Sequence, residues 1–234
     1  MTPNQSNQEL ARKDYQQLAL VSSSSSSEQE QEQKRKYVFS SDWFSQHISH
    51  WKRILHGLEN KKINVLEIGS FEGRSSTWIL DELFKNHESR LVSIDSFERL
   101  LPEIDSEKNF LENIRKTGKE NQVEVIKSNS WDALIQLNRE KRIIFDFIYI
   151  DASHIACDVL SDTVLSWNLL KEEGIMIFDD YDSNLYKEEY YNARIAIDSF
   201  LSCYQQHIKI IEKYYQVAIK KVKSNSTFKM IVNV

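Results

Sequence analysis

The stretch from Asn64 to Leu80 constrains the fold of this chain more than any other. It reads Asn-Val-Leu-Glu-Ile-Gly-Ser-Phe-Glu-Gly-Arg-Ser-Ser-Thr-Trp-Ile-Leu. The apolar, β-branched run over 63–68 predicts a strand covered on both faces, and the apolar residues that follow recur at helical spacing. Two of the chain's five glycines, Gly69 and Gly73, lie in the turn between them. A strand, a glycine turn and a helix form the unit at which α/β sheets bind nucleotide-like ligands, although the Glu-x-Gly-x-x-x-Gly spacing departs from the usual dinucleotide fingerprint.

The composition narrows the function classes. A formal net charge of −5 argues against a nucleic-acid partner, which usually requires a basic surface. The chain has neither an apolar run long enough to span a membrane nor an apolar signal core near its start. We therefore expect a soluble, cytoplasmic protein without membrane contact. Its two cysteines, Cys157 and Cys203, fall in helical patterns and are expected to be reduced, buried thiols.

Two regions differ sharply in composition. Residues 1–36 contain a serine run, Ser22 to Ser27, followed by an alternating Glu/Gln tract. Such a segment cannot bury enough apolar area to offset its ordering entropy, so we expect a disordered N-terminal tail. Residues 37–234 have the hydrophobic content of a single folded domain.

Within that domain, strand and helix patterns alternate. Strands are expected at 63–68, 91–95, 123–127, 145–150, 174–178, 208–212 and 217–222, and the chain closes with a further strand-like run at 228–232. Helices are expected near 74–86, 106–117, 131–138, 155–170 and 187–204. Alternation predicts an α/β, Rossmann-like, doubly wound sheet that is mainly parallel, with seven strands and helices on both faces. Late strands without a helix between them predict an antiparallel hairpin at one edge.

Two helical stripes are expected to pack in the core. Phe44, Ile48, Trp51 and Leu55 follow Ser40 or Ser41, either of which could cap a helix. This aromatic stripe precedes the first strand, so it could also cover a ligand crevice. The second stripe, within 155–170, consists of Ala156, Leu160, Val164 and Trp167.

Polar side chains follow the second and third expected strands. Asp95 ends the second strand, where a carboxylate can accept hydrogen bonds from both hydroxyls of a ribose; the alternative is a helix cap. Ser130 and Trp131 follow the third strand. They could bind the edge and face of an adenine ring, or instead cap a helix and pack in the core.

The fourth and fifth expected strands end in carboxylates. Asp151 follows the fourth, and Asp179 and Asp180 follow the fifth. Three like charges in one crevice repel each other unless a cation joins them, and hard oxygen ligands suit Mg²⁺, Mn²⁺ or Ca²⁺. The alternative is a helix cap at Asp151 and a solvated acidic pair. His154, three residues after Asp151, stands at an expected helix start that should keep its imidazole neutral, as a general base requires; a structural histidine is the alternative.

At this point the chain resembles the class I S-adenosylmethionine-dependent methyltransferases, from about Ile63 to its end. The run Val-Leu-Glu-Ile-Gly-Ser-Phe-Glu-Gly over 65–73 is similar to their first motif, and Asp95 to their acidic ribose ligand. The resemblance implies that Glu67 supports the loop and the cofactor amine. It also implies that seven residues hold the cofactor: Glu67, Gly69, Gly73, Ser75, Asp95, Ser130 and Trp131.

The segments 147–154 and 174–181 are more specific. They resemble the divalent-metal O-methyltransferases, notably the macrocin-type sugar O-methyltransferase branch. That resemblance implies that Asp151, Asp179 and Asp180 hold Mg²⁺ and that His154 is the base. The catechol-type branch differs, with Lys at the position of the base and Asn at that of Asp180.

The function expected from these observations is Mg²⁺-dependent methyl transfer from S-adenosylmethionine to a hydroxyl of a small molecule, such as a sugar, a glycoside or a vicinal diol. The partner is then a small-molecule acceptor, and a homodimer is left open. Two alternatives also stay open: a non-catalytic, cofactor-binding or regulatory protein on the same fold, and a metal-independent N-methyltransferase, because a fold alone does not determine function.

Overall fold

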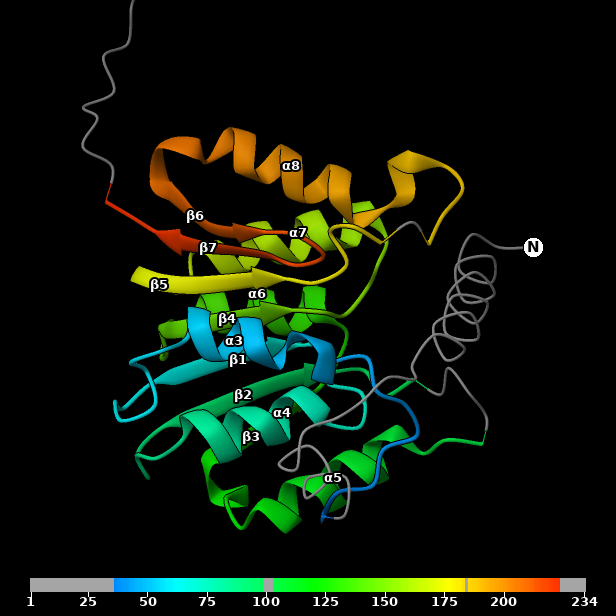
Figure 1. Cartoon of the computed structure of the whole chain (residues 1–234), viewed down its shortest axis with the longest axis vertical. Helices are drawn as coiled ribbons and strands as arrows, with labels where there is room; N and C mark the ends of the chain where they lie inside the picture. Colours follow the sequence, from blue (N-terminus) through cyan, green and yellow to red (C-terminus); the bar gives the residue numbers. More distant parts are fainter. Residues whose placement is uncertain (1–35, 99–102, 184, 224–234) are drawn as a thin grey trace, which may run out of the picture.

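The computed structural model of the chain describes residues 36–98, 103–183 and 185–223. These residues form a seven-stranded sheet with the strand order β3-β2-β1-β4-β5-β7-β6 (Figure 1). The strands are β1 (Asn64–Ile68), β2 (Arg90–Asp95), β3 (Val123–Lys127), β4 (Phe145–Ile150), β5 (Leu170–Phe178), β6 (Ile208–Lys213) and β7 (Val217–Lys221).

The sheet is mainly parallel, as the alternating pattern predicts. Strands β1 to β5 pair in parallel, whereas β7 runs antiparallel to both β5 and β6. The chain builds outward through β1, β2 and β3 and then returns to place β4 on the other side of β1. The carboxyl ends of β1 and β4 therefore flank the point where the strand order reverses, which is where open α/β sheets form a ligand crevice.

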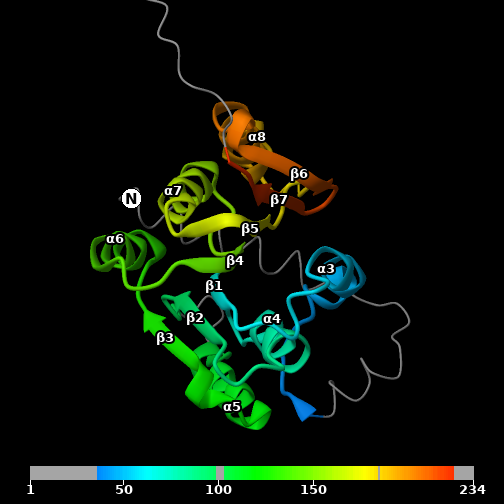
Figure 2. The same ribbon diagram turned by 90° about the vertical axis from the view of Figure 1, so that its left-hand side faces the viewer.

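Helices cover both faces of the sheet, and Figure 2 shows them on either side. One face carries α3 (Ile48–Ile54), α4 (Arg74–Trp78) and α5 (Ser106–Thr117), and the other carries α6 (Ser130–Glu140), α7 (Ala156–Trp167) and α8 (Ala193–Cys203). Short 3-10 helices lie between these elements, at Ser45–His47, Glu120–Gln122, Glu189–Tyr191 and Gln205–His207.

Two separate cores result from this arrangement. Leu66 and Ile68 of β1 pack with α6, α7 and α8, whereas Val65 packs with α3, α4 and α5. All three side chains are fully buried. Successive strand residues point to opposite faces, so a strand with helices on both sides carries apolar residues on both faces.

Several elements begin or end at other residues than the sequence predicts. Ser40 and Ser41 cap no helix, because the N–H and hydroxyl of Ser40 donate to Glu72 instead. The helix begins as the 3-10 turn at Ser45, before α3. After α4 the chain continues as a π-helical segment, Ile79–Leu83, rather than as one long α-helix. Strand β5 begins at Leu170, earlier than expected, and α7 ends correspondingly sooner.

The helix expected over 187–204 is interrupted at Asn192. Its side chain accepts from the N–H of Tyr186 and donates to the carbonyl of the same residue. These bonds hold Asn192 in an extended conformation, with φ −75° and ψ 147°, so the 3-10 turn stops there and α8 starts afterwards. The expected strand at 228–232, and the tail over 1–35, lie outside the described residues.

Two expectations about burial are wrong. In α7, Leu160 and Val164 are 37% and 40% exposed, and the helix buries Val159 and Thr163 instead. The buried face of α7 therefore includes polar residues, which a search for apolar residues at helical spacing does not find. Cys157 and Cys203 lie on helices as expected, but both are exposed. No helix among the described residues is long and apolar enough to cross a membrane.

Candidate functional site

One register row crosses four neighbouring strands at their carboxyl ends. Its members are Ile94 of β2, Ile68 of β1, Ile150 of β4 and Phe178 of β5. The residues that follow them are Asp95, which is the last residue of β2, and Gly69, Asp151 and Asp179, which leave the sheet. The N–H groups of Gly69, Asp151 and Asp179 donate to the row at 2.9, 2.8 and 3.0 Å. Parallel pairing thus brings together groups that are far apart in the sequence.

The turn after β1 requires glycine for two different reasons. Gly69 has φ +85°, and a Cβ there would lie 2.0 Å from the carbonyl oxygen of Asp151. Only glycine lets the first loop approach the end of β4 this closely. Gly73 has φ +80° and precedes α4, where a Cβ would lie 2.9 Å from the ring of Phe110. Gly73 borders neither of the two cavities described below.

Glu67 lies beneath this turn and is fully buried. Its carboxylate accepts hydrogen bonds from the hydroxyls of Ser75, Ser76 and Ser93. Burial raises the pKa of Glu67 to about 7, although the three hydroxyls act in the opposite direction. The carboxyl group ties β1 to β2 and to the start of α4, so it supports the turn from below.

Asp95 organises the same turn from the side of β2. Its Oδ2 accepts from the backbone N–H groups of Ser70 and Phe71, both at 2.8 Å, and its Oδ1 accepts from the N–H of Phe97 at 2.7 Å. Asp95 therefore does not cap a helix. Each carboxylate oxygen can accept two hydrogen bonds, so Oδ1 keeps the capacity to accept another.

A cavity of about 400 Å³ opens over these strand ends. Gly69, Asp95, Ser130, Trp131 and His154 all line it. The Trp131 side chain is 52% exposed, so the interpretation that it packs in the core is wrong. The cap of α6 is the side chain of Asn129, which accepts from the N–H of Asp132, and Ser130 begins the helix.

The three carboxylates of the fourth and fifth strands lie together. The Tyr149 hydroxyl lies 2.8 Å from Oδ2 of Asp151 and 2.7 Å from Oδ2 of Asp179. Gln216 donates to Oδ1 of Asp179 at 3.1 Å. Asp151 does not cap α7, whose cap residue is Ile155, and Asp180 is buried. The alternatives of a helix cap and a solvated pair are therefore wrong for these two residues.

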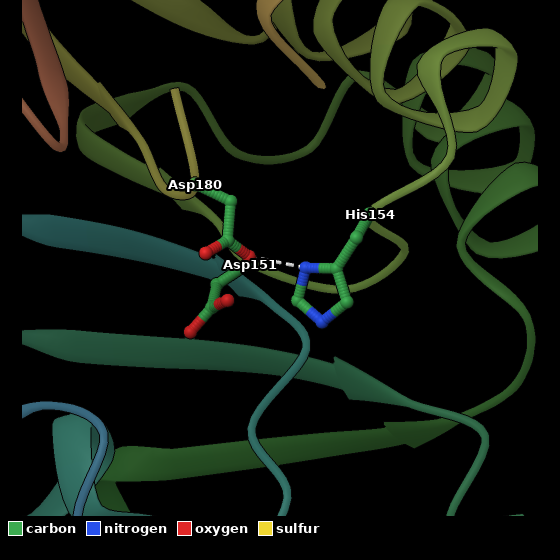
Figure 3. A group of neighbouring side chains, drawn as sticks. All are labelled: Asp151, His154 and Asp180. Atoms are coloured by element: carbon green, nitrogen blue, oxygen red, sulfur yellow. Dashed lines mark ion pairs between the residues drawn. The ribbon is translucent and has the colours of Figure 1, made fainter. Parts of the chain in front are cut away.

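His154 completes the cluster. Its Nδ1 forms an ion pair with Asp180, which is the dashed line in Figure 3, and Asp151 lies beside that pair. One donor atom each from Asp151, His154 and Asp180 lies within 4.8 Å of the other two. Tyr215 donates to the other oxygen of Asp180 at 2.7 Å. His154 lies before the first residue of α7, beside the carboxylate of Asp180, and the neutral state of its ring stays a prediction.

The charges of this cluster are strongly coupled. Burial, followed by repulsion from Asp179 and Asp180, raises the pKa of Asp151 well above its usual range. Burial and the charge of Asp180 also raise the pKa of Asp179. Burial acts to raise the pKa of Asp180 as well, but the attraction of His154 outweighs it and the pKa falls. A bound cation would relieve this repulsion, which makes the donor set suitable for one.

A second, smaller cavity of about 100 Å³ adjoins the first. Aromatic side chains form much of its wall, namely Phe39, Trp43, Phe44, Phe71 and Tyr215. The acidic cluster lines it as well, together with Ser75. Gly69, Ser70, Phe71, Asp151 and His154 line both cavities, so the two spaces meet at the glycine turn and the end of β4. The aromatic stripe that precedes β1 thus contributes to the site through Phe44.

Sequence reasoning missed several residues of this site. Tyr149 stands inside a strand, where an aromatic residue is ordinary. Tyr215 and Gln216 come from the turn between β6 and β7 and carry no motif. Asp162 of α7 also lines the larger cavity; an acidic residue on an otherwise buried helix face is the signal that could have identified it.

Comparison with known proteins identifies the family. Residues 66–181 match a family described as a methyltransferase domain. The O-methyltransferase hkm8 of Aspergillus hancockii is 27% identical over 123 residues, which are 53% of this chain and 44% of that protein. The chain thus spans less than half the length of this curated relative.

Solved structures agree on the fold. The MycE methyltransferase of mycinamycin biosynthesis, in complex with Mg and S-adenosylhomocysteine (SAH), has a TM-score of 0.61 at 14% identity and covers 86% of this chain and 56% of its own. An O-methyltransferase from Bacillus cereus in complex with SAH has a TM-score of 0.59 at 18% identity, and covers 95% of this chain and 93% of its own. TomG of Streptomyces achromogenes, an O-methyltransferase in complex with S-adenosylmethionine, has a TM-score of 0.59 at 15% identity and covers 95% of this chain and 100% of its own.

The family match begins in β1, includes the glycine turn and Asp95, and ends just after Asp180. It therefore contains the strand ends that line the larger cavity, on a sheet whose order reverses between β1 and β4. Residues 66–181 of this chain therefore form a methyltransferase domain.

Proposed function

We propose that this protein transfers a methyl group from S-adenosylmethionine to a hydroxyl group of a small molecule, with a divalent cation, Mg²⁺, held by Asp151, Asp179 and Asp180. The observation that carries the proposal is the junction of the two cavities. The larger one, at about 400 Å³, lies in the range of cofactor sites. The smaller one contains the acidic cluster, and His154 lines both.

The larger cavity offers the groups that a nucleoside with an amino-acid arm requires. Asp95 lines it with a carboxylate suited to a ribose diol. Ser130 and Trp131 provide a hydroxyl and a flat indole for a purine. At the other side, Gly69 allows close approach of the ligand to the backbone, and Glu67 holds the turn from beneath.

The acidic cluster fits a divalent cation. Asp151 and Asp179 lie on either side of one tyrosine hydroxyl, which has a single proton for two carboxylates. Repulsion raises the pKa of both carboxyl groups. Hard carboxylate oxygens in this number suit Mg²⁺. The Mg-bound MycE relative supports the choice of metal.

The chemistry follows from the positions of the residues. When bound, the cofactor supplies an electrophilic methyl group, and the cation supplies a Lewis acid that favours ionisation of a hydroxyl. His154 holds its Nδ1 against Asp180, so Nε2 is the nitrogen that would accept the hydroxyl proton. The walls of the two cavities would hold the acceptor hydroxyl close to the methyl group, which favours the reaction by orientation.

The smaller cavity restricts the acceptor. A volume of about 100 Å³ with aromatic walls takes one ring or ring-sized end of a larger molecule. A sugar, a glycoside or a vicinal diol meets this condition and can offer two neighbouring oxygens. The rest of a larger acceptor would remain outside.

The first test measures binding and turnover separately. Calorimetry with SAH should give binding that Asp95→Ala weakens by about 1–3 kcal/mol, because three backbone N–H groups and a diol lose their acceptor. The control, Asp198→Ala on α8, should leave the affinity unchanged. Unchanged binding in the Asp95 variant would remove that residue from the cofactor site.

The second test screens sugars, glycosides and catechols for methyl transfer, with Mg²⁺ and with chelator. Replacing Asp151, Asp179 or Asp180 by Asn should reduce turnover far more than it reduces the affinity for SAH. His154→Ala should lose roughly 10²–10⁴ in rate and recover partly at high pH. Full activity in excess chelator would contradict the metal mechanism, and SAH binding without any turnover would favour the regulatory alternative.

A further inference from the structure

We infer that Asp162 of α7 is a specificity residue of the cofactor site: its carboxyl group accepts a hydrogen bond from the 6-amino group of the adenine ring. This inference rests on the proposed function, because it assumes that the larger cavity holds S-adenosylmethionine. It adds a contact on a helix outside the glycine turn and the strand ends.

Asp162 is a buried acid without a full set of partners. The residue is 2% exposed, and its Oδ2 has no hydrogen-bond partner among the residues that the structure describes. Burial raises the pKa of Asp162 to about 7, and the hydroxyl of Ser130 acts in the opposite direction. Leaving such an oxygen unpaired is costly, and an N–H donor from a ligand would remove that cost.

The position of Asp162 decides which part of the ligand it meets. It lines the larger cavity only, as do Ser130 and Trp131, whereas Gly69 and Asp151 line both cavities. The methyl group of the cofactor must meet the acceptor at the residues that line both cavities. The adenine ring therefore belongs at the residues that line the larger cavity only. Asp158, one helical turn earlier, also lines the larger cavity, but it is exposed and its carboxylate already accepts from the Ser153 hydroxyl at 2.8 Å.

The chemistry of the two groups is complementary. The 6-amino group of adenine carries two N–H donors, and a carboxylate is an acceptor. The terminal torsion of an aspartate is broad and roughly two-fold, so rotation can present either oxygen to the cavity. A hypoxanthine ring carries a carbonyl at the same position, which would place two acceptors against each other. A site built in this way discriminates by the mismatch it creates with the wrong base.

The test compares two ligands by calorimetry at pH 8: SAH and S-inosylhomocysteine, which has the 6-oxo group. The unmodified protein should prefer SAH at least about 10-fold. Asp162→Asn should bring the ratio close to one, because an amide can accept from the amino group or donate to the carbonyl. Asp198→Asn on α8, a residue that lines neither of the two cavities, is the control and should keep the preference. Asp162→Ala provides the same comparison if the Asn variant does not fold.

Three results would overturn the inference: no preference in the unmodified protein, an unchanged ratio in Asp162→Asn, or an equal weakening of both ligands in that variant. The last result would indicate a purely structural role. If the unmodified protein binds neither ligand, the proposed function fails, and this outcome is distinct from the other three.

Discussion

Glu67→Gln should change how the stability of the protein depends on pH. Glu67 is fully buried beneath the glycine turn, and three serine hydroxyls donate to it. Its pKa is raised from 4.5 to about 7. Between these two values the folded state binds a proton that the unfolded state has released, so the free energy of unfolding falls as pH rises.

The size of the effect follows from that difference. At 1.36 kcal/mol per pH unit, a rise from 4.5 to about 7 corresponds to roughly 3 kcal/mol of stability, present below pH 4.5 and lost once pH passes about 7. Gln keeps the size of the side chain and does not titrate. Relative to Glu67→Gln, the unmodified protein should therefore lose about 3 kcal/mol of unfolding free energy between pH 4 and pH 8.

Urea unfolding at several pH values, for both proteins, measures this difference. Subtraction removes the contribution of Asp162, whose pKa is also raised to about 7 but which both proteins retain. Glu120→Gln, at an exposed position, is the matched control and should follow the unmodified protein. Parallel pH curves for Glu67→Gln and the unmodified protein would refute the reasoning, since they would mean that the pKa of Glu67 is the same in the folded and unfolded states.

Three further changes have defined outcomes. Gly69→Ala should destabilise the fold by at least about 3 kcal/mol in denaturant unfolding, because its Cβ would lie 2.0 Å from the carbonyl oxygen of Asp151; a loss under 1 kcal/mol would contradict this. Trp51→Ala should cost about 3–5 kcal/mol, since the side chain is fully buried, and the melting temperature reports the loss. Tyr215→Phe removes the bond to Asp180 and should weaken Mg²⁺ binding roughly 10–100-fold in calorimetry; unchanged affinity would exclude Tyr215 from supporting a metal ligand.

Much of the fold is determined locally and was therefore predictable. The alternation of short apolar runs with helical stripes predicts a doubly wound sheet, and the late strands without a helix predict the antiparallel edge. A strand that is apolar on both faces must be covered on both faces, which is typical of parallel sheets, and parallel pairing brings the carboxyl ends of neighbouring strands to one edge. The residues just after such strands, such as Asp95 and Asp151, were therefore identifiable as neighbours from their place in the chain alone.

Burial was predictable where one face of an element is uniformly apolar, and not where it is mixed. Phe44 and Trp51 pack as their spacing indicates. In α7, polar residues are buried against neighbouring helices, so Leu160 and Val164 face outward. Helix boundaries also depended on distant partners, as at Ser40, whose bond to Glu72 removes it from any cap.

The sequence by itself determined which acids end the strands and which residues form the turn, since both depend on short-range pattern and on parallel order. Only the tertiary structure decided what each charged group faces. Tyr149 lies between two carboxylates, His154 pairs with Asp180, and Asp162 lines the larger cavity. These contacts join residues from different strands, turns and helices, and the ionisation of a buried group depends on the summed effect of burial and of all its neighbours. The ionisation of these groups therefore cannot be predicted from a local sequence pattern, because their neighbours are set only when the chain folds.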